Sequence, residues 1–261
     1  MKNTIQSIYI YPIKSLGGIN LSSALAQPAG LQYDRRWMLV DEQNDFMTQR
    51  NYAEMCLFHQ SINKHFLSIQ FKAHQIDIPL AYEEKELETC QIWEDKTEAY
   101  EVDAQVSEWF STHLKKSCRL MRINKNHKRI HTEKGNLKMS LADGYPYLFI
   151  GTASLEYLNN KLDEAVPMNR FRPNVVVKTD KQHEEDTWKD FSIANTDFKG
   201  SHPCGRCRVV SINQQTANIG KEPLKTLSTY RREGQRVNFG MNVFCEHEGI
   251  IKVGETLKFD S

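Results

Sequence analysis

Short apolar runs separated by turn residues are the feature of this 261-residue sequence that most restricts its fold. Ser7–Pro12 alternates between apolar and polar side chains, and Trp37–Val40 is apolar throughout. Phe66–Phe71 and the residues around Gln91–Trp93 are further runs of this kind. Such runs are typical of β-strands. A membrane-spanning helix needs about 18 consecutive apolar residues, and the sequence has no such run.

Three segments show helical spacing instead. Asp103 is a candidate N-cap ahead of the apolar residues Val106 and Leu114, and a second helix is expected to begin near Thr152. A short third helix would have Pro223 in its first turn. Many short strands with a few helices predict a β-rich α+β fold, with two lobes and barrel-like sheets.

Charge is distributed unevenly along the chain. Residues 83–108 are dominated by Glu and Asp, whereas residues 115–138 carry nine Lys or Arg against one Glu. Two solvated faces joined by a polar linker would give this pattern. It also agrees with a lobe boundary near 120–140, and we expect one domain at 1–120 and another at 121–261.

Composition excludes several classes of protein. Hydrophobic residues make up 39% and charged residues 26%, with a formal net charge of +1, so no overall field attracts nucleic acid or an anionic membrane. The N-terminus alternates like a strand and lacks the apolar core of a signal peptide. Six cysteines, of which two are close together, do not resemble a disulfide framework, so we expect a reducing, cytoplasmic compartment.

The segment HPCGRCRVV brings two cysteines, Cys204 and Cys207, within three residues of each other. Arg206 and Arg208 flank Cys207, and a positive charge stabilises a thiolate. A thiolate is a soft ligand for a thiol-preferring metal. One interpretation is therefore a single metal-binding thiolate at Cys207.

Three other interpretations of the pair remain open. A structural zinc site needs two more ligands, and Cys245 and His247 have a spacing that matches no common zinc pattern. A redox pair normally begins a helix, whereas Val209–Ile212 has the β-branched character of a strand. Buried, unreactive thiols are the third interpretation, which fits the isolated cysteines better: Cys56, Cys90 and Cys118.

Cationic residues recur beside turns. Lys14 and Ser15 precede a Gly-Gly pair, a geometry that can bind an anion. Arg35 and Arg36 would lie on opposite faces of a strand, so one of them should point inward, whereas Arg170 and Arg172 share a face. Arg and Lys are the residues that bind phosphate. Together with a metal-type cysteine, these clusters favour a large phosphorylated cofactor.

Several of these segments, in their order, resemble the MOSC proteins that carry an N-terminal β-barrel domain. That group includes the mitochondrial amidoxime reducing component and bacterial reductases of N-hydroxylated bases. The motifs that carry the resemblance span nearly the whole chain: YPIKSLGG, YDRRWMLV, DGYPYLFIGTASLEYLN, FRPNVVV, PCGRC, EPLKTLSTYRR, FGMNVF and GIIKVGETL. The resemblance implies a MOSC N-terminal β-barrel domain at 1–120 and a MOSC domain at 121–261.

The resemblance also implies a molybdenum cofactor (molybdopterin), a phosphorylated pterin dithiolene. Cys207, the second cysteine of PCGRC, would be the metal ligand and a catalytic residue. Asp143 would be the second catalytic residue, near the metal or the substrate, where it would relay a proton. Polar residues of both lobes would bind the cofactor: Lys14, Ser15, Arg36, Thr152, Ser154, Arg172 and Asn174. Arg170, which shares a face with Arg172, is also expected to bind the cofactor.

The implied function is that of an oxidoreductase that reduces small N-hydroxylated or N-oxygenated compounds. Electrons would come from a separate flavin, haem or iron–sulfur protein, because the remaining cysteines do not have iron–sulfur spacing. The alternative is a carrier that transfers sulfur or the molybdenum cofactor. The resemblance also leaves pyridoxal phosphate binding open, and it implies no nucleic acid and no membrane span.

Overall fold

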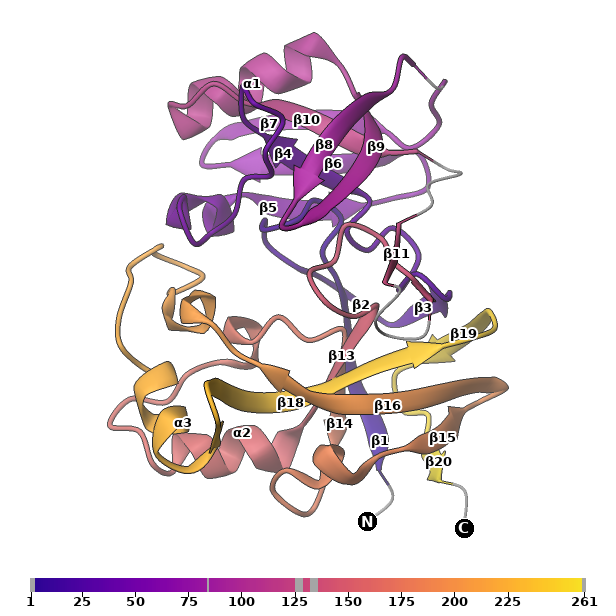
Figure 1. The fold of residues 1–261 in the computed structure, drawn as a ribbon, viewed down its shortest axis with the longest axis vertical. Coiled ribbons are helices and arrows are strands. Elements are labelled where there is room, and N and C mark those ends of the chain that lie inside the picture. The colour runs from indigo at the N-terminus through magenta and orange to yellow at the C-terminus, as the bar shows by residue number, and fades with distance from the viewer. Residues whose placement is uncertain (1–2, 84, 125–128, 132–135, 260–261) are drawn as a thin grey trace.

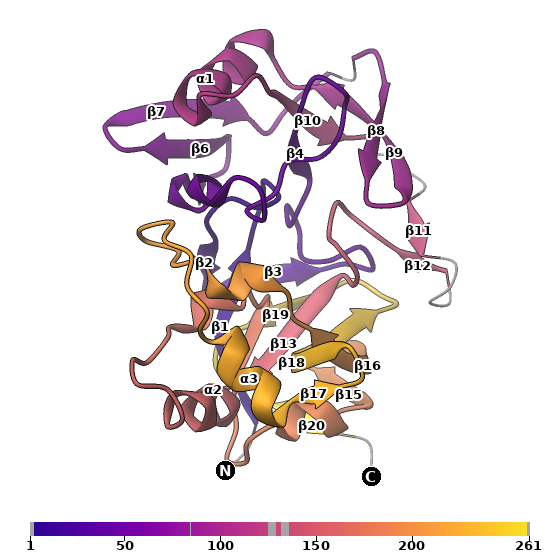
Figure 2. The same cartoon turned by 60° about the vertical axis from the view of Figure 1, so that its left-hand side comes forward.

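The computed structural model describes residues 3–83, 85–124, 129–131 and 136–259. Over these residues the protein is a β-rich α+β fold with twenty strands and three α-helices, which confirms the predicted fold class. Its two lobes lie one above the other in both views (Figures 1 and 2). None of the helices in this part of the chain has the length and apolar character that crossing a membrane requires.

The upper lobe contains two antiparallel sheets and one α-helix. Its elements are β4 (Trp37–Val40), the 3-10 helix η1 (Ala53–Leu57), β5 (His59–Ile62), β6 (Phe66–Phe71), β7 (His74–Pro79), β8 (Glu88–Ile92), β9 (Asp95–Glu101), α1 (Ala104–Leu114) and β10 (Arg119–Ile123). One sheet has the order β4-β10-β9-β8 and the other has the order β5-β6-β7. The short strands β11 (Ile130–His131) and β12 (Leu137–Lys138) pair with each other after this lobe.

Helix α1 begins and packs as its sequence predicts. The Asp103 side chain accepts hydrogen bonds from the backbone N–H groups of Gln105 and Val106, which are otherwise without partners at a helix start. Phe110 and Leu114 are buried in the core of the upper lobe. The predicted N-cap and the apolar face of this helix are therefore confirmed.

The lower lobe is built on one nine-stranded sheet. Its elements are β1 (Thr4–Ile10), β2 (Ile19–Leu21), β3 (Ser23–Ala26), β13 (Tyr147–Gly151), α2 (Thr152–Asn159), η3 (Met168–Arg170), β14 (Val175–Lys178), η4 (Glu184–Thr187), β15 (Asp190–Ile193), β16 (Thr196–Gly205), η5 (Arg208–Ser211), α3 (Leu224–Tyr230), β17 (Arg232–Glu233), β18 (Arg236–Cys245), β19 (Gly249–Lys252) and β20 (Leu257–Phe259). The sheet order is β2-β1-β14-β13-β18-β16-β15-β20, with β17 on β18. Strands β13 and β14 are parallel, and α2 provides the crossover that a parallel pair requires.

The first strand of the chain belongs to the lower lobe. Strand β1 pairs antiparallel with β14, and β3 pairs with β19 near the C-terminus. In the other direction, β10 extends past residue 120 and pairs with β4 and β9 of the upper lobe. A division at residue 120 therefore separates the sequence into two parts but does not separate the sheets.

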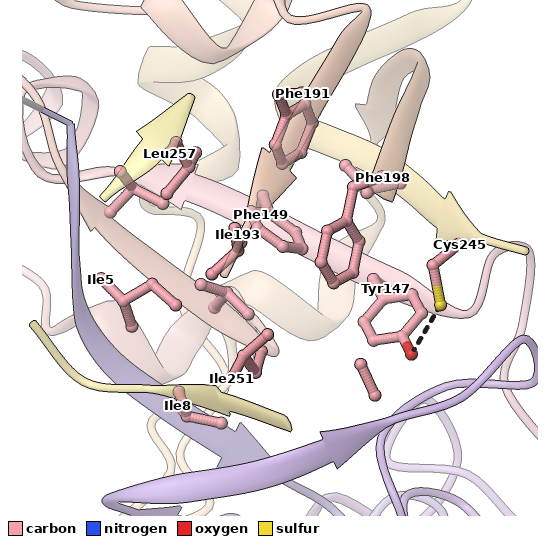
Figure 3. Close-up of a cluster of buried hydrophobic side chains, with 14 of the residues drawn as sticks. Ile5, Ile8, Tyr147, Phe149, Phe191, Ile193, Phe198, Cys245, Ile251 and Leu257 are labelled. Atoms are coloured by element: carbon pink, nitrogen blue, oxygen red, sulfur yellow. Dashed lines mark hydrogen bonds between the residues drawn. The ribbon is translucent and has the colours of Figure 1, made fainter. Parts of the chain in front are cut away.

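Aromatic and aliphatic side chains fill the core of the lower lobe. Figure 3 shows Phe149, Phe191 and Phe198 packed together on this sheet, with Ile5 and Ile8 of β1 nearby. Phe191 and Phe198 are stacked with their ring centroids 5.7 Å apart. Ile5 of β1 and Leu257 of β20 both belong to this core, so strands from near both ends of the chain contribute to it.

The segment after Cys207 differs from the prediction. Arg208–Ser211 forms the 3-10 helix η5, although the β-branched run Val209–Ile212 was expected to be a strand. The backbone N–H of Val210 donates to the carbonyl of Cys207, and the carbonyl of Val210 accepts from Arg170. Burial of Val210 and this tertiary hydrogen bond therefore outweigh its intrinsic preference for a strand.

Candidate functional site

Segments from both halves of the chain line a cavity of about 560 Å³. Lys14 and Ser15 reach it from the connection between β1 and β2, and residues 48–50 come from the upper lobe. Residues 142–145 precede β13, and residues 202–207 end β16. A volume of this size is typical of a site for a cofactor or a drug-sized ligand.

The cavity is strongly cationic. Six of its lining residues are Lys or Arg, whereas the lining residues include a single carboxylate, that of Asp143. The six are Lys14, Arg35, Arg50, Arg172, Arg206 and Arg236. Cations gathered in a hollow between low-dielectric walls attract anionic ligands.

Lys14 and Asp143 form an ion pair on the cavity wall. The Lys14 side chain is 5% exposed and Asp143 is 62% exposed. Nζ of Lys14 also donates to the carbonyl of Leu141 at 2.7 Å, and Trp93 Nε1 donates to Oδ1 of Asp143 at 3.0 Å. Although its position in the cavity opposes ionisation, the charge and hydrogen bond of Lys14 hold the pKa of Asp143 well below its usual range. The Asp143 carboxylate is therefore ionised at neutral pH.

Two guanidinium groups contact the ring of Tyr11. The guanidinium carbon of Arg35 lies 4.4 Å from the ring centroid and that of Arg172 lies 4.2 Å from it. Burial raises the pKa of Tyr11 to about 12 and lowers the pKa of Arg172 to about 10. Arg172 also donates to the carbonyl of Leu16 at 2.8 Å. The ring of Tyr11 therefore helps to hold two cations at the cavity, and the buried carboxylate of Asp34 pairs with one of them, Arg35.

The two thiols of the CGRC segment have different surroundings. Arg206 donates to Sγ of Cys204 at 3.2 Å and to the carbonyl of Phe171 at 2.6 Å. Cys207 also lines the cavity, and its thiol makes no hydrogen bond with any residue that the structure describes. The guanidinium of Arg206 therefore contacts the Cys204 sulfur, and an effect of Arg206 on the Cys207 thiol stays a prediction.

Ser15 and Asn174 lie on the cavity wall as the resemblance implies. Ser15 has a positive φ of 70°, and its carbonyl accepts a hydrogen bond from Gln49 at 2.6 Å. Asn174 uses its side-chain oxygen for the N–H of Leu148 and for Arg35, and its side-chain nitrogen for the carbonyl of Tyr9. Protein groups thus already occupy the amide of Asn174, while a cofactor-binding role for these residues stays a prediction.

Four residues that the resemblance assigns to the cofactor are not among those lining this cavity: Arg36, Thr152, Ser154 and Arg170. Ser154 is fully buried and donates to Glu185, and Thr152 accepts from the N–H of Thr179. Arg170 donates to the carbonyls of Val210 and Glu222. These contacts join α2 to η4 and to the end of β14, and they join η3 to η5, so in this structure the three side chains serve the scaffold.

Arg35 lines the cavity in place of Arg36. The two arginines were expected on opposite faces of a strand, and their side chains do line different cavities. They lie before β4, however, in a turn where Arg35 has a φ of 49°. Arg35 and Arg50 are cavity residues that the sequence reasoning missed. The alternation rule predicted that one of the two adjacent arginines points inward, but no local pattern marked Arg50.

A zinc site built on the CGRC pair is not supported. Among the residues that the structure describes, no three His, Cys, Asp or Glu side chains are grouped as metal ligands. Cys245, the expected third ligand, is buried, and its thiol lies 3.4 Å from the hydroxyl of Tyr147 (Figure 3). Cys204 and Cys207 thus share the cavity without the partners that zinc requires.

Comparison with known proteins identifies the two halves of the chain. The MOSC N-terminal beta barrel domain matches residues 2–117 and the MOSC domain matches residues 136–258. Mitochondrial amidoxime-reducing component 1 from Mus musculus is 28% identical over 97% of this chain and 81% of its own length. Molybdenum cofactor sulfurase from Oryza sativa subsp. japonica is 28% identical over 95% of this chain, which spans 33% of that protein.

The solved structures include the YUAD protein from Bacillus subtilis, which is 8% identical, with a TM-score of 0.41 over 98% of this chain and 94% of that chain. The two domain matches together cover the motifs from YPIKSLGG to GIIKVGETL, and they confirm the resemblance. The chain therefore belongs to the MOSC family, with a MOSC N-terminal beta barrel domain ahead of its MOSC domain.

Proposed function

We propose that the cavity binds a molybdenum cofactor and that Cys207 is its sulfur ligand from the protein. One observation carries the proposal: the Cys207 thiol and six Lys or Arg side chains line the same cavity. The donor set fits a phosphorylated pterin, since a soft thiol suits molybdenum and guanidinium groups suit a phosphate. Arg206 Nε is also buried without a hydrogen-bond partner among the described residues, so a donor near this sulfur pair remains unused.

Four cationic side chains of the cavity have a role in this proposal. Arg35 and Arg172, held by Tyr11, would neutralise the phosphate, and Lys14 would add a third positive charge. Arg206 would fix the loop between the two cysteines through the carbonyl of Phe171. When bound, the cofactor would supply the two-electron chemistry, and the chain would supply position and charge.

The reaction we propose is reduction of an N-hydroxylated compound, in which two electrons and two protons convert the N–O bond to N–H and water. Oδ1 of Asp143 accepts from Lys14 and Trp93, and Oδ2 makes no hydrogen bond with the described residues. Because its pKa is low, Asp143 suits a role as a hydrogen-bond acceptor for the substrate better than a role as a proton store. The substrate class rests on the relatives named as amidoxime-reducing components.

The proposal includes a separate electron donor of flavin, haem or iron–sulfur type. Cys56, Cys90, Cys118 and Cys245 are buried free thiols, so they provide no exposed set of ligands for an iron–sulfur cluster. The absence of disulfides among all six cysteines agrees with a cytoplasmic location, which remains part of the proposal.

The test uses the full chain produced in a host that makes the cofactor. Wild-type protein is expected to contain molybdenum and pterin, and to reduce an N-hydroxylated base with reduced methyl viologen as the donor. Cys207→Ser should lose most of this activity and keep the fold, whereas Cys118→Ser serves as a buried thiol control. Full activity in Cys207→Ser, or zinc in place of molybdenum, would contradict the proposal.

A second candidate function is transfer of sulfur or of the cofactor itself. It is favoured by the second thiol, because Cys204 lies on the same cavity and receives a hydrogen bond from Arg206. Relatives named as molybdenum cofactor sulfurases point in the same direction. Cys204→Ser separates the two candidates. A reductase with this substitution should still reduce the N-hydroxylated base, whereas a sulfur carrier that uses both thiols should no longer transfer sulfur.

A further inference from the structure

A second cavity of about 460 Å³ lies beside the turn that carries Arg35 and Arg36. Arg36 lines this cavity and not the first one, and segments of both lobes contribute to its wall. Its lining residues come from the segment between β3 and β4, the loop before β8, the end of β10, strand β12 and the turn before β19, and they include Arg36, Tyr82, Arg122, Ile123, Lys138 and Glu248. Cys207 and the other residues of the proposed cofactor site that the first cavity contains are not among them.

Arg122 is a buried cation on the wall of this cavity. It is 8% exposed, and its guanidinium lies between two rings, 4.6 Å from the centroid of Trp37 and 3.5 Å from that of Tyr82. A guanidinium has five N–H donors, and the described residues accept one of them, at the carbonyl of Leu80. The aromatic contacts fix the plane of the group while leaving its edge available to a ligand.

Arg36 is a second cation with weak partners. It is half-buried, and the single hydrogen bond of its side chain among the described residues is a 3.4 Å contact with Oε1 of Gln27. Burial lowers the pKa of Arg36 and that of Arg122, which means that each pays a desolvation cost for remaining charged.

The buried carboxylate of Asp34, which pairs with Arg35, also favours the charged form of Arg36, whereas among the described residues only tyrosines act in this way on Arg122. Neither Arg36, Arg122 nor Lys138 forms an ion pair within the described part of the chain, and the one acidic residue of the wall, Glu248, accepts from Gln27. A buried charge such as that of Arg122 is costly without a counter-charge. An anion bound in the cavity would supply that counter-charge.

We propose that this cavity binds a small organic anion, with its carboxylate or phosphate on Arg36 and Arg122. Pro28, Ala29 and Ile123 add apolar residues to the wall, so the ligand has an apolar or aromatic body attached to its anionic group. Lys138, which is exposed, adds positive charge at the rim. The site does not depend on molybdenum, on Cys207 or on the proposed reaction.

Isothermal titration of the full chain with benzoate, AMP and inorganic phosphate tests the site. Benzoate or AMP should bind, and inorganic phosphate should bind more weakly because it buries no apolar surface. Arg36→Gln should weaken binding of the organic probe about tenfold or more, since it removes a charge-assisted hydrogen bond. Lys138→Gln replaces an exposed side chain, so it should keep the fold and weaken binding roughly threefold.

Arg172→Gln is the matched control, because it removes a cation from the first cavity instead. The first cavity is itself cationic and can bind the same probes, so the prediction concerns one binding event: the one that Arg36→Gln weakens should be unchanged in Arg172→Gln. Loss of binding in Arg172→Gln with retention in Arg36→Gln would place the anion in the first cavity and overturn the proposal. The proposal is also overturned if neither organic probe binds, if inorganic phosphate binds as tightly as they do, or if Arg36→Gln binds like the wild type.

Discussion

Replacing Asn174 by alanine tests whether this residue supports the scaffold or contacts a cofactor. Asn174 is 1% exposed and connects β1, β13 and the Arg35 side chain. Its Oδ1 accepts from the backbone N–H of Leu148 at 3.2 Å and from Arg35 at 3.1 Å, and its Nδ2 donates to the carbonyl of Tyr9 at 3.2 Å. The alanine variant removes all three hydrogen bonds at once.

The expected loss of stability follows from what remains unpaired. The N–H of Leu148 would stay without this acceptor, which costs about 1–3 kcal/mol, and each of the other two bonds contributes about 0.5–1.5 kcal/mol. Arg35 keeps Asp34 as a partner, and water from the cavity can reach the wall, so we expect a total of about 3 kcal/mol. For a chain of this size, that loss lowers Tm by roughly 6–12 °C.

Urea denaturation followed by circular dichroism at pH 7.5 measures the effect. Asn169→Ala is the control, because Asn169 is exposed and its replacement should change the free energy of unfolding by less than about 0.5 kcal/mol. If Asn174→Ala unfolded like the wild type and yet lost its molybdenum, the scaffold role argued here would be refuted.

Three further predictions concern charge and support. Burial and, to a smaller extent, Arg231 lower the pKa of His183 to about 4. The unfolded chain therefore takes up a proton near pH 6.5 that the folded chain does not, and the free energy of unfolding should fall by about 1 kcal/mol between pH 7.5 and pH 5. Urea titrations should show no such decrease in His183→Asn. Lys14→Met should raise the pKa of Asp143, because it removes the neighbouring charge, and a carbon-13 NMR titration that stayed unchanged would contradict this. Arg170→Gln should lower the free energy of unfolding by about 2 kcal/mol, because the carbonyls of Val210 and Glu222 lose a charged donor, and a change below about 0.5 kcal/mol would argue against that support.

The strand and helix patterns predicted the class of the fold but not the pairing of its strands. Period-two alternation at Ser7–Pro12 and the Asp103 cap depend on neighbours in sequence, and the structure confirms a strand over Thr4–Ile10 and a helix over Ala104–Leu114. The pairing of β1 with β14 joins residues far apart in sequence, and local patterns carry no information about it. Val209–Ile212 shows the same limit, because its carbonyl partner, Arg170, lies in another segment.

The candidate site was predicted best where a motif contains both the side chain and its turn. Lys14, Ser15, Asp143 and Arg172 stand in such motifs, and all four line the cavity with Cys207. Thr152 and Ser154 were also in a motif, but which side of α2 meets the cavity depends on how the helix packs. The choice between Arg35 and Arg36 depended on backbone dihedrals in a turn, which residue identity alone does not determine.

The place of β1 inside the lower sheet affects how the chain is made. Ile5 pairs with Val177, so about 170 residues must be synthesised before the first strand meets its partner. At 5–20 residues per second, that delay is on the order of 10–30 s, during which the apolar side of Ile5 and Ile8 is uncovered. Strand β2, the other neighbour of β1 in the sheet, follows it almost directly in the chain, so one side of β1 can pair early while the other side waits for β14.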